Sequence, residues 1–473
     1  MKKTFGILII IALTLFCLAS CNKAPSAITL IINGDIEGYF EEVDLLEYTL
    51  NPFDNGDGNQ MKGYQLSQVI NSVNTLNDNN WLLITASDKT SALVESNSAD
   101  KIYIVIENDE LHIKAPQHPR LVGIKDVEDI TVVSKNESLE SGLKIINEKD
   151  DIVVSYGNVK LMLFEMTANN KMYGNIAYKY MPKEKVKLSD LTQEEKNLVY
   201  FDNFDITKDY NDGYLIWEDG RLGYSRQDKI YQGMIFGIIA GIDTVLYDSY
   251  YVMKNALDND QKVMFILPDG LSIEQIEYYY DDLRILNANY KIAASVHPAI
   301  SNVALASILT GVSPYKNGIW QRGVKAPDVP DIFEYALSLN KTVRYIEGNS
   351  NLVVTSVAPT LNIADVNGYT DTNVYNSAIK ALEDDPDLIF IHFHGIDDVG
   401  HQYSAIHNRT KEKIIKIESY IINLIDAFDG IVIILPDHGM ITYYEDDIAK
   451  GRHGFFEWRD MLVPYYIMED SNE

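Results

Sequence analysis

The sequence is poor in cysteine, with two in 473 residues, Cys17 and Cys21, both near the amino terminus. Beyond residue 21 there is no thiol, so neither a disulfide nor a thiolate metal site can form there. A metal bound by the rest of the chain must therefore be held by carboxylates, imidazoles or other oxygen and nitrogen ligands.

Basic residues are also scarce, with 40 lysines and arginines against 69 aspartates and glutamates and a net charge of −29. Duplex nucleic acids recruit basic surfaces, so this charge argues against a DNA or RNA duplex as a partner. It does not exclude phosphate chemistry, because bound metal ions can reverse the local field around an acidic site.

Long hydrophobic runs are missing after the amino terminus, since even the run at 234–242 is too short to cross a bilayer. Residues 5–18 form an apolar segment that follows two lysines, as in a secretory signal. Residues 18–21, Leu-Ala-Ser-Cys, resemble a bacterial lipobox. The resemblance implies a lipoprotein signal peptide at 1–21, lipidation of Cys21 and an extracytoplasmic protein anchored to the bacterial cell membrane. A plain signal peptide or membrane anchor is the alternative.

Hydrophobic residues make up 46% of the chain and aromatic residues 11%, which is ample material for packed cores. At 473 residues the chain is too long for one ordinary core, so we expect several domains. Short strand-like runs separated by turns predict a β-rich domain over 22–135. The part at 136–260 is predicted to hold a second β-rich module, with paired strands at 152–156 and 159–164, and a linker helix within 231–257.

The strand order of the first β-rich domain resembles the small β-rich domain of sulfite-oxidase-type molybdopterin proteins. The pattern consists of a hairpin at 102–113, the segment 119–122 and a closing strand at 130–133. The cysteine that ligates molybdenum in that family has no counterpart here. The resemblance therefore implies a fold used for binding or spacing without the cofactor, and the protein partner of this region is unknown.

Strand and helix patterns alternate over 261–473, which predicts an α/β domain whose parallel sheet has helices on both faces. Three apolar runs, 263–268, 389–393 and 431–436, are typical of buried parallel strands. Acidic or imidazole side chains follow each run, and seven of the nine histidines lie in this domain. Because open α/β sheets place their chemistry beyond the carboxyl ends of the strands, these side chains indicate one metal site.

The candidate metal ligands follow these three strands and lie in one glycine-flanked segment near the carboxyl end. Asp397 and His401 are four residues apart across a predicted loop, close enough to hold one ion, and Asp398 is a rival for Asp397. Carboxylates and imidazoles without thiolate suit a catalytic zinc ion, with manganese or iron possible. The candidates are Asp269, Asp397, His401, Asp437, His438 and His453.

The order of these motifs resembles the alkaline phosphatase superfamily, specifically its type I phosphodiesterase/nucleotide pyrophosphatase branch. The resemblance covers the C-terminal domain and implies an alkaline-phosphatase-like sheet with two divalent ions, zinc in that family, about 4 Å apart. The four-residue gap in the family motif favours Asp397 over Asp398. Matched motif by motif, one ion falls to Asp269, Asp437 and His438, shared with the nucleophile, and the other to Asp397, His401 and His453.

The same resemblance places the nucleophile nine residues before the Thr-Gly of a TGxxP segment, here 310–314. Counting back gives Ser301, also a ligand of the first ion, where the family more often has threonine. Ser301 is expected to begin a helix, whose free N–H groups favour an anionic phosphate, and metal coordination would activate its hydroxyl. Asn302 and Arg322 are the expected phosphate-binding side chains.

Together these features predict a lipid-anchored two-metal phosphoric-ester hydrolase, similar to phosphodiesterases and nucleotide pyrophosphatases. It would act through a phosphoseryl intermediate on a small-molecule or headgroup phosphate ester. One alternative is an alkaline phosphomonoesterase, and another is a non-catalytic surface-binding lipoprotein that uses the phosphatase fold as a scaffold. A formylglycine sulfatase is a poor match, because it requires proline and arginine where this chain has Val303 and Leu305.

Overall fold

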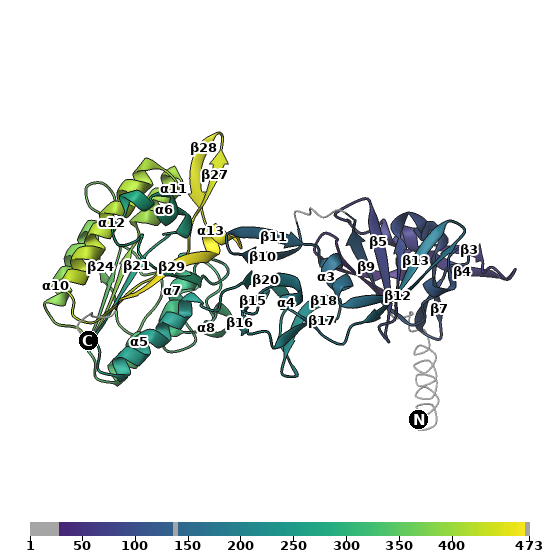
Figure 1. Ribbon diagram of the computed structural model, residues 1–473, viewed down its shortest axis with the longest axis horizontal. Coiled ribbons are helices and arrows are strands. Elements are labelled where there is room, and N and C mark those ends of the chain that lie inside the picture. The colour runs from purple at the N-terminus through teal and green to yellow at the C-terminus, as the bar shows by residue number, and fades with distance from the viewer. Residues whose placement is uncertain (1–27, 136–140, 469–473) are drawn as a thin grey trace, which may run out of the picture. The chain divides into compact units, whose positions relative to one another are not determined.

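The computed structural model describes residues 28–135 and 141–468, so the predicted lipidation site Cys21 lies outside the described residues. The chain forms two compact units, whose elements are labelled in Figure 1. The predicted module at 136–260 is divided between them, and the domain boundaries expected at 135 and 260 stay predictions. Unit 1 comprises the residues up to 142, 154–185 and 217–221, and unit 2 comprises 143–153, 186–216 and the chain from 222 onward.

Unit 1 is built on a mixed seven-stranded sheet in the order β12-β13-β6-β5-β9-β1-β2. Leu82 and Ile84 of β5, and Ile130 and Val132 of β9, enter the same core, because alternate residues of a strand share a face. The bounds are β1 Thr29–Gly34, β2 Phe40–Asp44, β5 Asn80–Ala86, β6 Ser91–Glu95, β9 Val127–Ser134, β12 Phe164–Met172 and β13 Asn175–Pro182.

A second, four-stranded sheet of unit 1 has the order β3-β4-β7-β8. The predominance of strands confirms the predicted β-rich N-terminal portion, while its likeness to the molybdopterin-protein domain stays a prediction. The remaining bounds are β3 Leu50–Asp54, β4 Gln60–Gln65, β7 Tyr103–Glu107, β8 Glu110–Lys114, α2 Leu66–Ile70, α3 Tyr156–Met162, and the 3₁₀ helices η1 Leu45–Glu47, η2 Ser96–Lys101 and η3 Arg120–Val122.

The segment 159–164, predicted as a strand, lies largely in helix α3. The Ser155 hydroxyl oxygen accepts a hydrogen bond from the Asn158 N–H, which caps the helix, and the hydroxyl donates to buried Asp35. Short apolar runs suit either element, so these capping contacts decide in favour of the helix.

A buried ion pair joins α3 to the sheet of unit 1. Lys160 Nζ lies 2.5 Å from Asp129 Oδ1, and the two side chains are 1% and 5% exposed. Burial lowers the pKa of Lys160, and the neighbouring Asp129 carboxylate opposes that shift. Each charge is therefore held in the interior by the other.

We expect Asp129→Ala to lower the free energy of unfolding of unit 1 by about 3–5 kcal/mol, because it leaves a buried ammonium group without its counter-ion. Urea unfolding followed by circular dichroism measures this change. The double variant Asp129→Leu with Lys160→Met is the control and should recover most of the loss. A single variant as stable as the parent chain would show that the pair adds nothing to stability.

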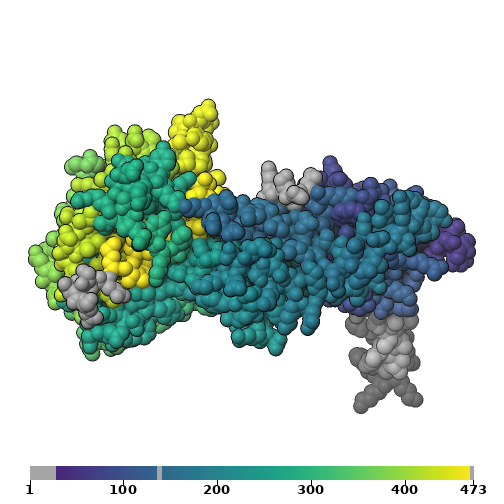
Figure 2. Space-filling model, viewed as in Figure 1, coloured from purple at the N-terminus to yellow at the C-terminus, as the bar shows by residue number. Residues whose placement is uncertain are grey.

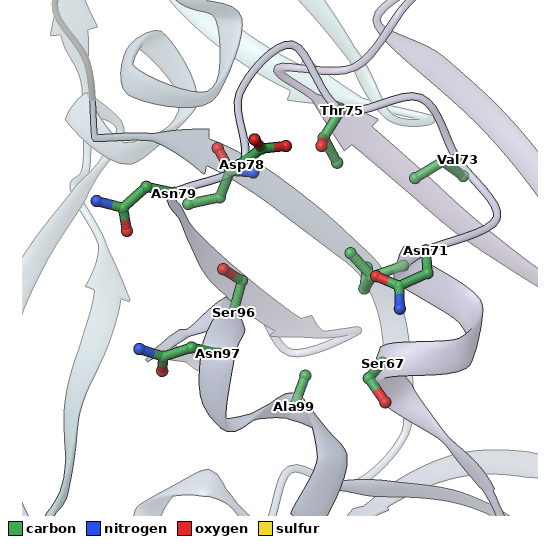
Figure 3. Close-up of a pocket in the computed structure, with 11 residues that line it drawn as sticks. Ser67, Asn71, Val73, Thr75, Asp78, Asn79, Ser96, Asn97 and Ala99 are labelled. Carbon is green, nitrogen blue, oxygen red and sulfur yellow. The ribbon is translucent and has the colours of Figure 1, made fainter.

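A polar cavity of about 430 Å³ opens on unit 1, lined by α2, the chain after it, the segment 78–80 and η2 (Figure 3). Asparagine and serine side chains predominate, among them Asn71, Asn97 and Ser96. Asp78 is the one charged side chain in the lining, which contains no cation and no aromatic ring. The cavity thus offers hydrogen-bonding groups but no positive charge for an anionic ligand.

Unit 2 contains a seven-stranded sheet in the order β22-β29-β26-β21-β25-β23-β24. In sheet order, the strands β26, β21, β25, β23 and β24 pair in parallel, each one with its neighbour. β29 runs antiparallel to both β22 and β26. The bounds are β21 Val263–Pro268, β22 Lys291–Ala294, β23 Val343–Glu347, β24 Thr360–Leu361, β25 Leu388–Phe393, β26 Ile431–Ile434 and β29 Leu462–Met468.

Helices cover both faces of this sheet, which confirms the predicted α/β fold (Figure 1). Val263 and Phe265 of β21 pack against α5, α7 and α9, while Met264 and Ile266 pack against α10 and α12. The alternation follows from the pleat of the strand. The bounds are α5 Ser249–Asp258, α6 Ile273–Tyr278, α7 Ser301–Thr310, α8 Pro314–Asn317, α9 Ile332–Ser338, α10 Asp371–Leu382, α11 Gly395–Tyr403, α12 Asn408–Asp426, α13 Trp458–Met461, η4 Leu246–Asp248 and η5 Tyr280–Asp282.

Within 28–135 and 141–468, no helix is both long enough and apolar enough to cross a membrane.

The helix expected within 231–257 begins only at Ser249, because residues 235–240 form strand β20. This apolar run pairs with β10 on one side and β15 on the other, and strand pairing decides between two elements that a short apolar run can form. The smaller sheets have the orders β11-β10-β20-β15-β16, β14-β17-β18-β19 and β27-β28. The bounds are β10 Leu143–Asn147, β11 Asp150–Val154, β14 Val186–Lys187, α4 Ser189–Thr192, β15 Asn197–Phe201, β16 Ile206–Asp209, β17 Gly213–Glu218, β18 Arg221–Arg226, β19 Lys229–Ile230, β20 Ile235–Ala240, β27 Ile441–Glu445 and β28 Ile448–Arg452.

Candidate metal centre

Four neighbouring strands of the unit 2 sheet, in the order β26-β21-β25-β23, end at the same edge. Asp269 directly follows β21, and Asp437 and His438 come shortly after β26. The Gly270 N–H donates to Asp437 Oδ1 over 3.2 Å, which fixes the two strand ends against each other. Ligands far apart in the sequence meet here because their strands are parallel neighbours.

Asp397 and His401 lie on helix α11 and not on the predicted loop. A helix places residues four apart on one face, so His401 Nε2 lies 3.3 Å from Asp397 Oδ2. Gly400 leaves room for the Met440 side chain, because a Cβ there would lie 2.2 Å from the sulfur of Met440. The glycines at 395 and 400 weaken the helical signal, which is why the sequence suggested a loop.

His453 reaches the site directly after the β27–β28 hairpin, which stands out from the surface of unit 2 (Figures 1 and 2). Its Nε2 lies 3.8 Å from Asp397 Oδ1, and its ring stacks on that of His438 with centroids 3.8 Å apart. Buried Asp460 accepts hydrogen bonds from the N–H groups of Gly454 and Phe455, each over 2.6 Å, and so holds the turn after His453. No motif in the sequence marks Asp460.

The predicted ligands gather into groups whose ligand atoms all lie within 4.8 Å of one another. Among the described residues these groups include Asp397 but not Asp398, as the family spacing favoured. His401 joins the second group through its contact with Asp397. The groups are Asp269 with Asp437 and His438, Asp397 with His438 and His453, and Asp269 with His392 and His394.

Four buried carboxylate oxygens in this region have no hydrogen-bond partner: Asp269 Oδ1, Asp397 Oδ1, Asp437 Oδ2 and Asp460 Oδ1. The first three belong to predicted metal ligands, and in each of these carboxylates the other oxygen is engaged by a histidine or a backbone N–H. A buried carboxylate oxygen without a partner is costly unless a cation binds it. The residues present therefore fit divalent metal ions.

Backbone carbonyls orient the three predicted histidine ligands in the same way. In each ring Nδ1 lies 2.9 Å from a carbonyl oxygen. A carbonyl only accepts hydrogen bonds, so Nδ1 carries the proton and Nε2 presents its lone pair to the site, as is usual for metal-binding histidines. The pairs are His401 with Gly451, His438 with Gly439 and His453 with Ala299.

Burial and the neighbouring charges shift the pKa values of these groups. Burial, reinforced by the Asp269 carboxylate, raises the pKa of Asp437 to about 7. Burial disfavours the charged form of His438, but the Asp437 and Asp269 carboxylates outweigh it and raise the pKa to about 9. Burial and the charge of His438 lower the pKa of His453 to about 4. Metal ions compete with protons for such ligands, so ion binding and protonation exclude each other here.

Ser301 begins helix α7, as the sequence predicted. Its Oγ lies 3.2 Å from His438 Nε2 and therefore faces the group of Asp269, Asp437 and His438. The first helical hydrogen bonds run to the carbonyl of Ile300, so the N–H groups at the very start of α7 precede the helical ladder and favour an anion. A hydroxyl and a helix amino terminus thus meet beside the candidate ligands.

The two predicted phosphate-binding side chains differ in their placement. Both amide hydrogens of Asn302 donate to backbone carbonyls, of Gln321 over 2.9 Å and of Val324 over 3.0 Å. Asn302 thus holds the loop that carries Arg322, which corrects its predicted role as a donor to the substrate. Arg322 itself is exposed, with Nη2 3.5 Å from His453 Nε2, so its guanidinium lies beside the candidate ligands.

Glu347, at the carboxyl end of β23, is a further residue that the sequence analysis missed. It is fully buried and contacts both His392 and His394. A signal was present, because Glu347 and Gly348 repeat the acid–glycine pair that follows β21, but the strand before them was not among the runs that indicated a metal site.

Comparisons with known proteins bear on the C-terminal part of the chain. Residues 335–453 match the family model of the metalloenzyme superfamily. No curated protein matches the chain. Among solved structures, phosphonoacetate hydrolase from Sinorhizobium meliloti is 15% identical with a TM-score of 0.33, and the match covers 40% of this chain and 58% of that one, less than two thirds of its length. Murine ectonucleotide pyrophosphatase/phosphodiesterase 5 is 12% identical with a TM-score of 0.35, covering 43% of this chain and 87% of that one.

The matched segment contains five of the predicted ligands, Asp397, His401, Asp437, His438 and His453, while Asp269 and Ser301 precede it. The match implies metal ions at the site that these residues form. Residues 335–453 are thus similar to the metalloenzyme superfamily, the alkaline-phosphatase-like group that the motifs of this chain resemble.

Proposed function

We propose that unit 2 is a two-metal hydrolase of phosphoric esters, similar to phosphodiesterases and nucleotide pyrophosphatases, with Ser301 as the nucleophile. The observation that carries this proposal is the convergence of carboxylate oxygens without a hydrogen-bond partner on the Nε2 atoms of His438 and His453, with Ser301 Oγ 3.2 Å from His438 Nε2. Carboxylate and imidazole donors suit Zn²⁺, with Mn²⁺ or iron as alternatives.

The proposed ligand sets are those that the motifs indicated. Each set contains at least one carboxylate with an unpaired oxygen. When bound, two divalent ions lower the pKa of a coordinated hydroxyl and neutralise charge that develops on the phosphoryl and leaving oxygens. The sets are Asp269, Asp437, His438 and Ser301 for one ion, and Asp397, His401 and His453 for the other.

The side chains of this chain supply the remaining steps. Ser301 Oγ attacks phosphorus, the bond between phosphorus and the ester oxygen breaks, and the leaving alcohol takes up a proton. Water then cleaves the phosphoseryl intermediate and restores the serine hydroxyl. The amino terminus of α7 stabilises the phosphoryl oxygens. The exposed guanidinium of Arg322 beside His453 is suited to a bidentate hydrogen bond with the phosphate.

We further propose that the enzyme works outside the cytoplasm, attached to the bacterial cell membrane by a lipid on Cys21. The support is the lipobox-like segment 18–21 behind an apolar run and two lysines. A substrate in this setting is a small-molecule or headgroup phosphate ester, and the net charge of −29 disfavours a nucleic-acid duplex.

The proposal predicts chelator-sensitive hydrolysis of bis-p-nitrophenyl phosphate, faster than that of p-nitrophenyl phosphate, by the soluble chain from Asn22 in the presence of zinc. The assay follows nitrophenolate release for both esters, with and without chelator. Faster turnover of the monoester would favour an alkaline phosphomonoesterase. The non-catalytic surface lipoprotein would be favoured if the chain binds two ions but hydrolyses neither ester nor a wider panel of pyrophosphates.

A further inference from the structure

Asp269, His392, Glu347 and His394 form a closed ring of side chains, of which the first three are buried and His394 is partly exposed. His392 and His394 each lie between the carboxylates of Asp269 and Glu347. His392 Nε2 and His394 Nδ1 lie 3.3 and 3.2 Å from the same oxygen, Asp269 Oδ2. On the other side His392 Nδ1 lies 3.1 Å from Glu347 Oε2, and His394 Nε2 contacts Glu347 Oε1.

These two imidazoles differ from the three predicted histidine ligands. All four of their ring nitrogens face carboxylate oxygens, whereas each predicted ligand has Nδ1 on a backbone carbonyl and only Nε2 toward the carboxylates of the site. Each of these two imidazoles therefore links Asp269 to Glu347. Although Asp269, His392 and His394 lie close enough for an ion, the ring is a set of charge-assisted hydrogen bonds.

Glu347 is held in the ring by four hydrogen-bond donors. Its Oε2 accepts the Tyr345 hydroxyl over 2.5 Å and its Oε1 accepts the Gly348 N–H over 3.0 Å, so with the two imidazoles each oxygen has two donors. β23 and β25 are parallel neighbours in register, which brings the residue after Ile346 level with His392. A fully buried carboxylate with four donors has one stable orientation.

The ring leaves Asp269 with one oxygen for the metal site. Its Oδ2 is taken by the two imidazoles, while its Oδ1 has no hydrogen-bond partner and lies 3.5 Å from His438 Nε2. Without Glu347, neither imidazole would have a second partner to fix its orientation against Asp269.

We propose that Glu347 is a positioning residue for metal binding: through His392 and His394 it holds Asp269 so that Oδ1 faces the ion shared with Ser301. This role rests on the proposed two-metal function. It predicts that Glu347 affects one of the two ions, because Asp269 belongs to one ligand set. Asp397, His401 and His453 make no contact with Glu347 among the interactions described.

The test is zinc binding by Glu347→Gln in the full soluble chain, measured by competition with a chromophoric chelator and by metal analysis. Zn²⁺ binding at one site should weaken by roughly 10–100-fold, the usual effect of losing a partner of a metal ligand, while the other site keeps its affinity. Glu418→Gln is the matched control, because Glu418 is also buried in unit 2 and accepts backbone N–H groups from residues 284–286, none of which is a proposed ligand. It should lower the melting temperature and leave both zinc affinities unchanged.

Unchanged affinity at both sites in Glu347→Gln would overturn the proposal, as would equal weakening at both. Three zinc ions per wild-type chain, with one lost in the variant, would overturn it by showing that the ring itself holds an ion. Wild-type protein that binds no zinc would instead refute the two-metal function, and the positioning role with it. If Glu347→Gln does not fold, Tyr345→Phe removes one donor to Glu347 and should weaken the same site severalfold.

Discussion

Replacement of Ser301 by alanine is expected to reduce phosphodiester hydrolysis by roughly 10³-fold or more, because it removes the proposed nucleophile and leaves the rest of the site in place. Ser301 Oγ lies 3.2 Å from His438 Nε2 at the start of α7, the position from which it can reach both an ion and a phosphoryl group. Steady-state kinetics with bis-p-nitrophenyl phosphate give the change in kcat/KM, and metal analysis shows whether two ions stay bound.

Two other variants make this result specific. Ser307→Ala changes a buried serine of the same helix, whose hydroxyl accepts a hydrogen bond from Asn317, and should keep nearly full activity. Ser301→Thr should retain turnover, because threonine offers the same hydroxyl and is the commoner residue in the family that the motifs resemble. Full activity in Ser301→Ala would mean that another group, or water itself, attacks the phosphorus.

Removal of the metal ions is the second change with a large expected effect. It should abolish turnover and lower the melting temperature of the chain from Asn22 by roughly 10 °C or more, since ligands bound to the native state at 1,000 times their Kd each contribute about 4 kcal/mol. The physical reason lies in the site: without cations, Asp269, Asp397 and Asp437 place three unpaired carboxylate oxygens together in the interior. Differential scanning calorimetry with and without chelator measures the shift.

Readdition of zinc should restore both the activity and the melting temperature, which separates loss of metal from irreversible unfolding. Asp437→Asn provides the matched control, because it removes a buried ligand and its charge together and should make the melting temperature less sensitive to chelator. A contrary result would be a protein that is purified with two ions per chain and yet keeps its melting temperature and turnover when chelator is added. That result would contradict the assignment of these carboxylates as ligands.

The sequence predicted the central parallel strands of the unit 2 sheet, but not its antiparallel strands β22 and β29. The apolar runs at 263–268, 389–393 and 431–436 became β21, β25 and β26, the neighbouring parallel strands at the centre of the sheet. Each of these runs is followed within three residues by an acidic or imidazole side chain and a glycine, a turn signal that marks locally where the strand ends. For the same reason the residue types of the metal site could be read in order along the chain.

Short segments were less reliable, because their pattern suits more than one element. Residues 159–163 and 235–240 were assigned to the wrong element, and Asp397 and His401 were placed on a loop instead of α11. In each case a contact from elsewhere decided the outcome: the Ser155 and Asp35 contacts, pairing with β10 and β15, or the packing of Met440 against Gly400.

By itself the sequence indicated which side chains could bind metal and that Asp269, Asp437 and His438 follow apolar strands. The tertiary structure alone decided how each is oriented: Nδ1 of His453 is held by the carbonyl of Ala299, 154 residues away, and His392 by Glu347, 45 residues away. It also decided that the Asn302 amide donates to the loop that carries Arg322 and not, as expected, to a phosphate. The reason is that ligand identity is a property of single residues, whereas the direction of a lone pair depends on partners that only the folded chain brings within hydrogen-bond distance.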